Sequence, residues 1–334
     1  MTSLTTGWSS YLCFMSVYNK PYLTIADQVA LLKSRGLIIT DSPKAEHYLS
    51  KIGYYRLSGY SYVFRKSVLE IGSTTPCVLD EFKDSVRFDD ILALYVFDKK
   101  LRLILLDAIE RIEVALRVDV SLYLGEHNSK AHLDPSYLYS HFSEIRSGQR
   151  TSRFEDWVQK FQKSFKDSRE DFVLHFKEKY PNCDLPIWMA VELWDFGTLS
   201  KYMDNLKDAY KAPIARQYGL ETNKLIGSWL HTINVVRNIC AHHGRLWNRV
   251  IATKPMYPKS HEAFLLRQMV ENGVPPNRIF SAICIIQYLM RQISPNSHWH
   301  TRLVDCINNF PVSPYTNIAM MGFKDDWQLW QLWE

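Results

Sequence analysis

The segment RNICAHHGRLWN, residues 237–248, gathers side chains that could act on a phosphodiester. Arg237 and His242 are five positions apart, and Asn238 directly follows the arginine. A histidine titrates near neutrality, so it can take a proton from a ribose 2′-hydroxyl or give one to a departing 5′ oxygen. A guanidinium stays charged and can hold two phosphate oxygens at once. These residue types fit a cleavage of RNA that needs no metal ion or other cofactor, and DNA is spared because it lacks the 2′-hydroxyl.

The spacing of the pair sets a geometric condition on this chemistry. Five residues of an α-helix correspond to a rotation of about 140°, so Arg237 and His242 of one regular helix point in different directions. Asn238 and His242 are four positions apart and share a face. The pair therefore requires a helix that ends close to it, for which Gly244 is suited, or a second copy of the chain in a two-fold dimer.

The same segment allows two other interpretations. Cys240 and His242 could form a nucleophile and its base, although two positions on a helix place them on different faces and no third residue orients them. His231, Cys240, His242 and His243 could hold zinc, although their spacing matches none of the common ligand patterns. We therefore expect no metal site here.

A second segment, YYRLSGYSYVFRK at residues 54–66, alternates aromatic and cationic side chains. Exposed aromatic rings beside cations can line a groove for stacked bases. Packing between helices is the commoner role of aromatics at this density, and it remains the alternative. Together with two residues of the first segment, the candidate RNA contacts are Tyr54, Tyr55, Arg56, His243 and Arg245.

The elements that must position these residues read as helices, and almost no alternating β pattern of useful length is present. Thr24 and Ser42 are expected N-caps, the latter followed by Pro43, and glycines are expected to end helices at positions 36, 53 and 125. Connections are expected over 72–83 and 126–153. The expected helices cover residues 24–36, 42–53, 88–125, 154–180, 186–207, from about 222 into the first motif, 260–272, 277–293 and 297–309.

The predicted helix over 88–125 is the longest and reads as the spine of a bundle, with apolar residues three or four apart. Glu113 and Arg117 on its polar side form an i, i+4 pair. Farther along, the lysine-rich pattern over 154–180 indicates a solvated basic face. Pro186 opens the next helix, and Gly197 is expected to interrupt or end it.

Composition bounds the class of protein. The chain has 334 residues, 46% hydrophobic and 22% charged, which is typical of a soluble globular protein, and its net charge of +5 permits a nucleic-acid partner. The longest charge-free apolar run near the C-terminus, 279–290, is shorter than the about 20 residues that span a membrane. No signal peptide is evident, and the six scattered cysteines include no C-x-x-C pair, so we expect a cytoplasmic protein without disulfides. Phosphate-binding glycine loops and the H-E-x-x-H motif are absent.

Four segments in register carry a family resemblance, and together with the sequence around them they extend from about residue 18 to residue 309. They resemble the AbiD/AbiF-like abortive-infection family, which usually begins near MSVYNKPYLT, so residues 1–14 read as an upstream extension and Met15 as an alternative start. The segments are IGYYRLSGY (52–60), FDKKLRLILLDAIERIEVALR (97–117), LPIWMAVELWDFGTLSKYMDNLK (185–207) and SWLHTINVVRNICAHHGRLWNR (228–249).

The resemblance implies a branch of the HEPN group, whose R-x4-6-H motif forms a metal-independent endoribonuclease site, typically at a dimer interface. The RNA-guided RNases of type VI CRISPR systems are distantly similar. By this resemblance Arg237 and His242 are the motif residues, and Asn238 takes the polar position that orients His242 or the substrate. The implied fold is all-α, a HEPN-like helical core at 88–254 between helical regions at 18–87 and 255–334, after an N-terminal extension at 1–17.

The resemblance also implies a role in phage defence. The expected protein is a homodimeric, toxin-like RNase that leaves a 2′,3′-cyclic phosphate and is restrained by an antitoxin or inhibitor until infection. A non-catalytic alternative is an RNA-binding module that holds a structured or guide-like non-coding RNA. A third alternative is a helical interaction protein in which Arg237 and His242 only cap a helix.

Overall fold

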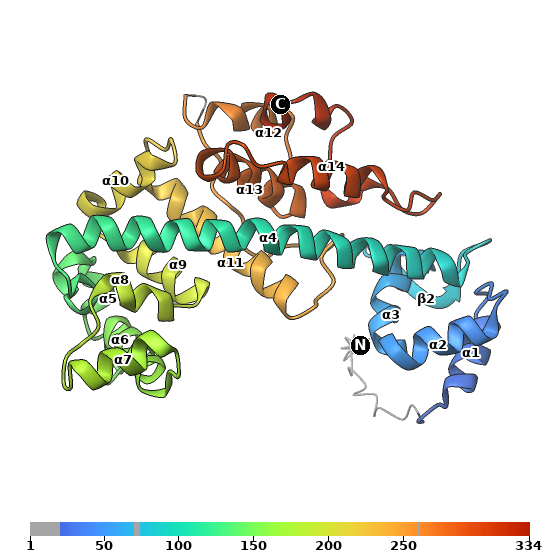
Figure 1. The fold of residues 1–334 in the computed structure, drawn as a ribbon. Helices are drawn as coiled ribbons and strands as arrows, with labels where there is room; N and C mark the ends of the chain where they lie inside the picture. The colour runs from blue at the N-terminus through green and yellow to red at the C-terminus, as the bar shows by residue number, and fades with distance from the viewer. Residues whose placement is uncertain (1–20, 70–73, 260) are drawn as a thin grey trace, which may run out of the picture. The chain divides into compact units, whose positions relative to one another are not determined.

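The computed structural model describes residues 21–69, 74–259 and 261–334, so the expected N-terminal extension lies outside the described residues. The described residues hold fourteen α-helices and one two-stranded sheet, which confirms the all-α class (Figure 1). Two compact units are distinguished: Met1–Ser58 with Phe64–Phe88, and Gly59–Val63 with Asp89–Glu334. Within the described residues, no helix has the length and apolar character that a membrane span requires.

The first two helices of the first unit begin at side-chain caps. Helix α1, Ile25–Ser34, starts at Thr24, which accepts a hydrogen bond from the Asp27 N–H while the Asp27 carboxylate accepts one from the Thr24 N–H, as expected. Helix α2, Ser42–Ile52, is capped by Asp41 and not by Ser42, because the Asp41 carboxylate accepts from the Lys44 N–H at 2.9 Å. The predicted cap was therefore wrong by one position.

The aromatic segment that follows changes its structure twice. Helix α3, Tyr54–Ser61, leads through a 3₁₀ turn into strand β1, Arg65–Val68, which pairs antiparallel with β2, Cys77–Phe82. The connection expected over 72–83 thus contains a strand. The strand was not predicted because it lacks a clear alternation of apolar and polar residues, and only Phe82 of β2 is buried. The Asp80 carboxylate of β2 forms ion pairs with the guanidinium groups of Arg35 and Arg65, at 2.6 and 3.1 Å.

Helix α4, Phe88–His127, runs for 40 residues and is the predicted spine. It continues past Gly125, which was expected to end it. A Cβ on Gly125 would lie 3.2 Å from the Trp188 ring, so this glycine makes room for a neighbouring side chain. The predicted Glu113–Arg117 pair is confirmed at 2.6 Å.

Two predicted helices are each broken in two. Residues 154–180 form α6, Arg153–Asp167, and α7, Asp171–Lys179, because the backbone is extended at Ser168 and Glu170. Residues 186–207 form a short α8, Ile187–Ala190, and α9, Phe196–Asn205. The second break precedes Gly197, since the Asp195 carboxylate caps α9 by accepting from the Thr198 N–H at 2.6 Å.

The remaining helices belong to the second unit. Figure 1 shows α9 and α11 on one side of α4, and α13 and α14 on the other. Helix α10 was not predicted, because Pro213 lies in its interior and proline normally disfavours a helix. The segments are α5, Ser140–Ser143; α10, Asp208–Gln217; α11, Asn223–Ala241; α12, Arg267–Glu271; α13, Ile279–Ile293; and α14, Trp299–Asn308.

A buried histidine stands in the aromatic core beside α6. His132 is 0% exposed, and its ring lies edge-on to Phe161 at 5.1 Å between centroids and near Trp194 at 6.2 Å. Neither ring nitrogen has a hydrogen-bond partner among the described residues. Burial disfavours the charged ring and lowers the pKa of His132 to about 4.

We expect His132 to make the fold sensitive to acid. The unfolded chain binds a proton at this ring near pH 6.5 and the folded chain only near pH 4, so stability is complete above pH 6.5 and is lost as the pH falls towards 4. The loss amounts to about 3 kcal/mol. Urea unfolding at pH 7.5 and 4.5 should show a smaller fall in the free energy of unfolding for His132→Phe than for the parent. The exposed-site control His175→Gln should keep the parental pH dependence, and an equal fall in all three proteins would contradict the assignment.

Candidate functional site

The motif residues occupy the last turn of α11 and the turn behind it. The helix is regular through Ala241, and His242 is its C-cap, with its N–H donating to the Asn238 carbonyl at 3.0 Å. The chain then reverses at His243, whose N–H donates to the Cys240 carbonyl at 3.1 Å. These bonds confirm the expected helix end and place His242 at its rim.

The turn that stops the helix uses a histidine where glycine is usual. His243 has a φ of +56°, and the Gly244 N–H donates back to the Ile239 carbonyl at 2.8 Å, which completes a Schellman motif. Gly244 itself sits where a Cβ would lie 3.2 Å from that carbonyl oxygen. The left-handed conformation strains a residue with a side chain by about 1 kcal/mol, and such strain clusters at functional sites.

A buried carboxylate holds this turn in place. Asp98 of α4 is 0% exposed and accepts hydrogen bonds from the Tyr60 hydroxyl, at 2.6 Å, and from the Arg102 guanidinium. The backbone N–H groups of Leu246 and Trp247 donate to the same carboxylate, at 3.2 and 2.8 Å. Burial, with the Asp98 carboxylate beside it, raises the pKa of the Tyr60 hydroxyl far above its usual value, so this group remains a donor.

Two guanidinium groups extend the anchor. Arg102, itself buried, also donates to the Gly244 carbonyl at 3.2 Å. Arg245 donates to the Gly59 carbonyl at 2.6 Å, so the structure gives this predicted RNA contact a structural partner. The turn after α11 is thereby bonded to α4 and to the segment at Gly59 through backbone and side-chain groups.

Arg237 lacks the strong partners that Arg102, Arg117 and Arg245 have. Its side chain is partly buried, yet its one hydrogen bond among the described residues is a long one, 3.4 Å, to the Asn238 side chain, and no described carboxylate forms an ion pair with it. The nearby Glu113 carboxylate is paired with Arg117. Burial raises the pKa of Glu113, and the charges of Arg117 and Arg237 oppose that shift. The guanidinium of Arg237 is therefore available to an anion from outside the chain.

His242 and Asn238 are exposed, and the described residues offer no hydrogen-bond partner to the His242 ring. Because α11 is helical between positions 237 and 241, the rotation of about 140° applies to Arg237 and His242. No described hydrogen bond or ion pair joins the two side chains within one chain. One copy thus presents both groups at the same helix end and leaves them unconnected.

The alternative chemistries at this helix end find little support. Cys240 is buried, and burial raises the pKa of its thiol to about 12, so a thiolate nucleophile is disfavoured. The described residues contain no group of three or more His, Cys, Asp or Glu side chains that could hold a metal ion.

The other predicted RNA contacts lie in the first unit. Tyr55 is 91% exposed and Arg56 is exposed, whereas the Tyr54 hydroxyl accepts from the Arg35 guanidinium at 2.9 Å. Two further aromatics of the segment, Tyr60 and Phe64, are buried, which fits the packing alternative for them. Tyr54, Tyr55 and Arg56 thus belong to a different unit from the motif.

Two residues of the site, Arg249 and Asp98, were not predicted from the sequence. Arg249 is exposed, and its Nη1 lies 3.7 Å from the position of a Cβ on Gly244, so it adds a cation at the end of α11. Arg249 lies within the segment 228–249 that carries the family resemblance, and that location could have marked it as a candidate site residue. Asp98 was missed because an Asp–Arg pair at i, i+4 reads as an exposed salt bridge.

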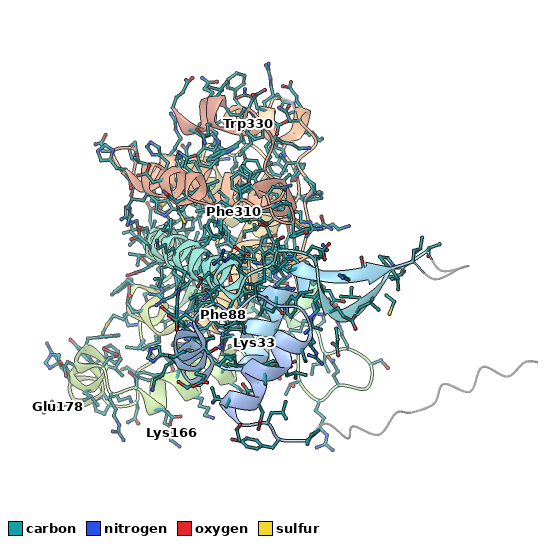
Figure 2. The ribbon with its side chains drawn as sticks, turned by 90° about the vertical axis from the view of Figure 1, so that its right-hand side faces the viewer. Lys33, Phe88, Lys166, Glu178, Phe310 and Trp330 are labelled. Atoms are coloured by element: carbon teal, nitrogen blue, oxygen red, sulfur yellow. The ribbon has the colours of Figure 1, made fainter. Side chains whose placement is uncertain are left out.

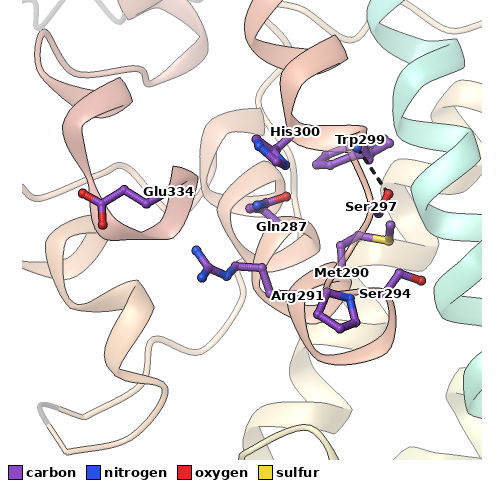
Figure 3. Close-up of a pocket in the computed structure, with 9 residues that line it drawn as sticks. Gln287, Met290, Arg291, Ser294, Ser297, Trp299, His300 and Glu334 are labelled. Atoms are coloured by element: carbon purple, nitrogen blue, oxygen red, sulfur yellow. Dashed lines mark hydrogen bonds between the residues drawn. The ribbon is translucent and has the colours of Figure 1, made fainter.

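A separate hollow of about 150 Å³ lies beside α13 and α14, lined by Gln287, Arg291, Trp299 and His300 among others (Figure 3). Its main donors are already engaged, because Gln287 and Arg291 donate to the backbone carbonyls of Leu332 and Gln331 at 3.2 and 2.9 Å. These two hydrogen bonds hold the C-terminal segment against α13.

A protein-family model described as Abi-like protein matches residues 47–248, more than half of the chain. The matched range contains Asp98, Arg237 and His242. Neither the curated proteins nor the solved structures contain a match to the chain.

We expect Asp98→Asn to lower the free energy of unfolding by about 3 kcal/mol, because it leaves the buried Arg102 charge without its counter-charge. Urea unfolding measures the change. Asp107→Asn is the matched control on the same helix, since Asp107 pairs with Arg111 and Arg302 at partly exposed positions and should matter by less than about 1 kcal/mol. Equal losses for the two variants would show that Asp98 is no anchor.

We also expect the free energy of unfolding of His243→Gly to exceed that of His243→Ala by about 1 kcal/mol, because both variants lack the imidazole and only glycine adopts the left-handed conformation without strain. Thermal unfolding of both variants tests this, and equal stability of the two variants would contradict the strain assigned to the backbone.

Proposed function

The chain belongs to the Abi-like protein family, which indicates a role in abortive infection, a defence against phage, and we propose that it acts there as a metal-independent endoribonuclease. Arg237 and His242 are the proposed catalytic residues, with Asn238 in support. The proposal places the enzyme in the cytoplasm with RNA as its substrate, and an antitoxin or inhibitor restrains it before infection.

The observation that carries the proposal is the partly buried Arg237, which has no ion-pair partner among the described residues, at the same helix end as the exposed His242 and its anchored turn. Partly buried guanidinium groups are normally paired, because removing their charge from water is unfavourable. A phosphodiester supplies the missing negative charge and can accept two hydrogen bonds from one guanidinium. The anchored turn keeps His242 in a fixed position, as acid–base catalysis requires.

The proposed reaction is an internal displacement at phosphorus. His242 removes the proton from the ribose 2′-hydroxyl, the 2′ oxygen forms a bond to phosphorus, and the bond from phosphorus to the 5′ oxygen breaks. The leaving oxygen takes a proton from a protonated His242 or from water, which gives a 2′,3′-cyclic phosphate and a 5′-hydroxyl end. Arg237 holds the non-bridging oxygens as charge builds up on them, and Asn238 orients His242 or the substrate.

The proposed active form is a two-fold dimer. The rotation of about 140° between Arg237 and His242 separates them on one helix. A two-fold axis near the end of α11 would bring the arginine of one protomer towards the histidine of its partner, because an isologous interface places the same surface on both sides.

The same separation favours a second candidate function. A single chain presents a guanidinium and an imidazole that can each bind phosphate without acting on a common atom. An RNA-binding module that holds a structured or guide-like RNA would use them in that way, with no cleavage.

We expect the purified protein to cleave labelled RNA in the presence of EDTA and to leave 2′,3′-cyclic phosphate ends, which mass spectrometry identifies. Arg237→Ala should lower kcat/KM by about 10²–10³-fold, as the loss of a transition-state donor does. His242→Ala should lower it by about 10²–10⁴-fold. Arg267→Ala, which removes a surface arginine paired with Glu271, is the control and should change the rate by less than about twofold.

Cleavage that survives both motif substitutions, or that EDTA abolishes, would exclude the proposed site. Mixing the two inactive variants tests the dimer, because a mixed dimer rebuilds one intact Arg237–His242 pair. No recovery from the mixture, alongside activity in the parent, would assign catalysis to a single chain. RNA that copurifies and stays uncut under all conditions would favour the second candidate.

A further inference from the structure

A shallow hollow opens on the surface of α6 and α7, in a part of the second unit that the proposed reaction does not use. Its volume is about 630 Å³. The residues that line it are Gln162, Lys163, Phe165, Lys166 and Lys177.

The apolar member of the hollow is a fixed aromatic ring. Phe165 is partly exposed, and its ring is nearly parallel to that of Phe161, at 7° and 6.5 Å between centroids. Phe176 of α7 meets the same ring edge-on at 6.5 Å. Contacts on two sides limit the motion of the ring, and another flat ring can stack on its partly exposed surface when the flexible Lys177 side chain moves aside.

The rim of the hollow is cationic. The Lys177 ammonium lies 4.9 Å from the centroid of the Phe165 ring and donates to the Lys166 carbonyl at 3.1 Å. Lys163 and Lys166 are exposed, and neither forms an ion pair with a described carboxylate (Lys166 is labelled in Figure 2). No acidic residue lines the hollow. Three lysines of the basic face expected from the sequence thus line the hollow together with one aromatic ring.

We infer that this hollow binds an unpaired base of single-stranded RNA, with the base stacked on Phe165 and the flanking phosphates on Lys163 and Lys166. Aromatic rings beside cations are how proteins hold single strands without reading their sequence. The inference rests on the proposed function, since RNA is the proposed substrate, and it adds a contact that captures the strand outside the cleavage site. An acidic peptide would use the lysines but not the ring, and a duplex keeps its bases stacked within the helix.

Fluorescence anisotropy with a labelled, unstructured oligoribonucleotide tests the inference in a His242→Ala background, where the RNA stays intact. Phe165→Leu keeps an apolar side chain and removes the ring, so Kd should rise about 5-fold or more. The double substitution Lys163→Gln and Lys166→Gln should lower the slope of log K against log salt by about 1.4, as expected when two contacts to a single strand are lost. Lys224→Gln, an exposed lysine outside the hollow, should leave both quantities unchanged, and thermal unfolding of each variant checks the fold.

Unchanged affinity and salt slope in the folded variants would overturn the inference. It would also be overturned if Phe165→Leu bound RNA normally while polyglutamate displaced the RNA, because the hollow would then be a site for acidic peptides. A matched duplex that bound as tightly as the single strand would contradict base stacking. Cleavage by the parent protein is measured separately. The two measurements therefore distinguish a nuclease whose hollow does not bind RNA from an inactive protein whose hollow does.

Discussion

The carboxylate of Asp98 is buried away from water, and the position of the motif turn depends on how that charge is satisfied. Its donors come from three places in the chain: Tyr60, Arg102 on its own helix, and the backbone after α11. An unpaired charge at this depth would be strongly destabilising, so the backbone that follows Gly244 cannot move away without a large penalty. A local motif on α11 thus acquires a fixed position from a residue about 140 positions earlier in the sequence.

The helices were predictable from sequence where the periodic apolar pattern was long, as in α4, α11 and α13. Predicted helix boundaries were wrong where a glycine was taken to mark the end of a helix. Gly125 and Gly197 resemble helix ends, but both lie inside helices, and each faces a neighbouring side chain within 3.5 Å of where a Cβ would be. The actual breaks come from side-chain caps such as Asp195 and from the extended backbone at Ser168. A single sequence does not reveal which neighbour approaches a glycine, because that approach is a tertiary contact.

The candidate site divides in the same way. Spacing and residue chemistry were enough to select Arg237, Asn238 and His242, and the requirement for a helix end near them is met by the reversal at His243. The anchor at Asp98 could not be found from spacing, since burial distinguishes it from the many surface pairs at i, i+4. The left-handed conformation of His243 was not predicted either, because glycine usually takes that position in such a turn and Gly244 was therefore expected to end the helix.

The charge balance around α11 argues that Arg237 is more than a solvated surface residue. Two carboxylates of this region already have a cation, since Glu113 pairs with Arg117 and Asp195 with Lys160, at 2.6 and 2.8 Å. Burial alone would raise the pKa of Asp195, but the hydrogen bonds from Lys160 and Thr198 outweigh it and lower that pKa, so this carboxylate is ionised and occupied. Arg237 is left partly buried without an ionic partner among the described residues, and such a position is stabilised by an anion that the chain does not supply. A polyanion would supply that charge at the helix end where His242 is exposed, which supports the proposed RNA site over helix capping.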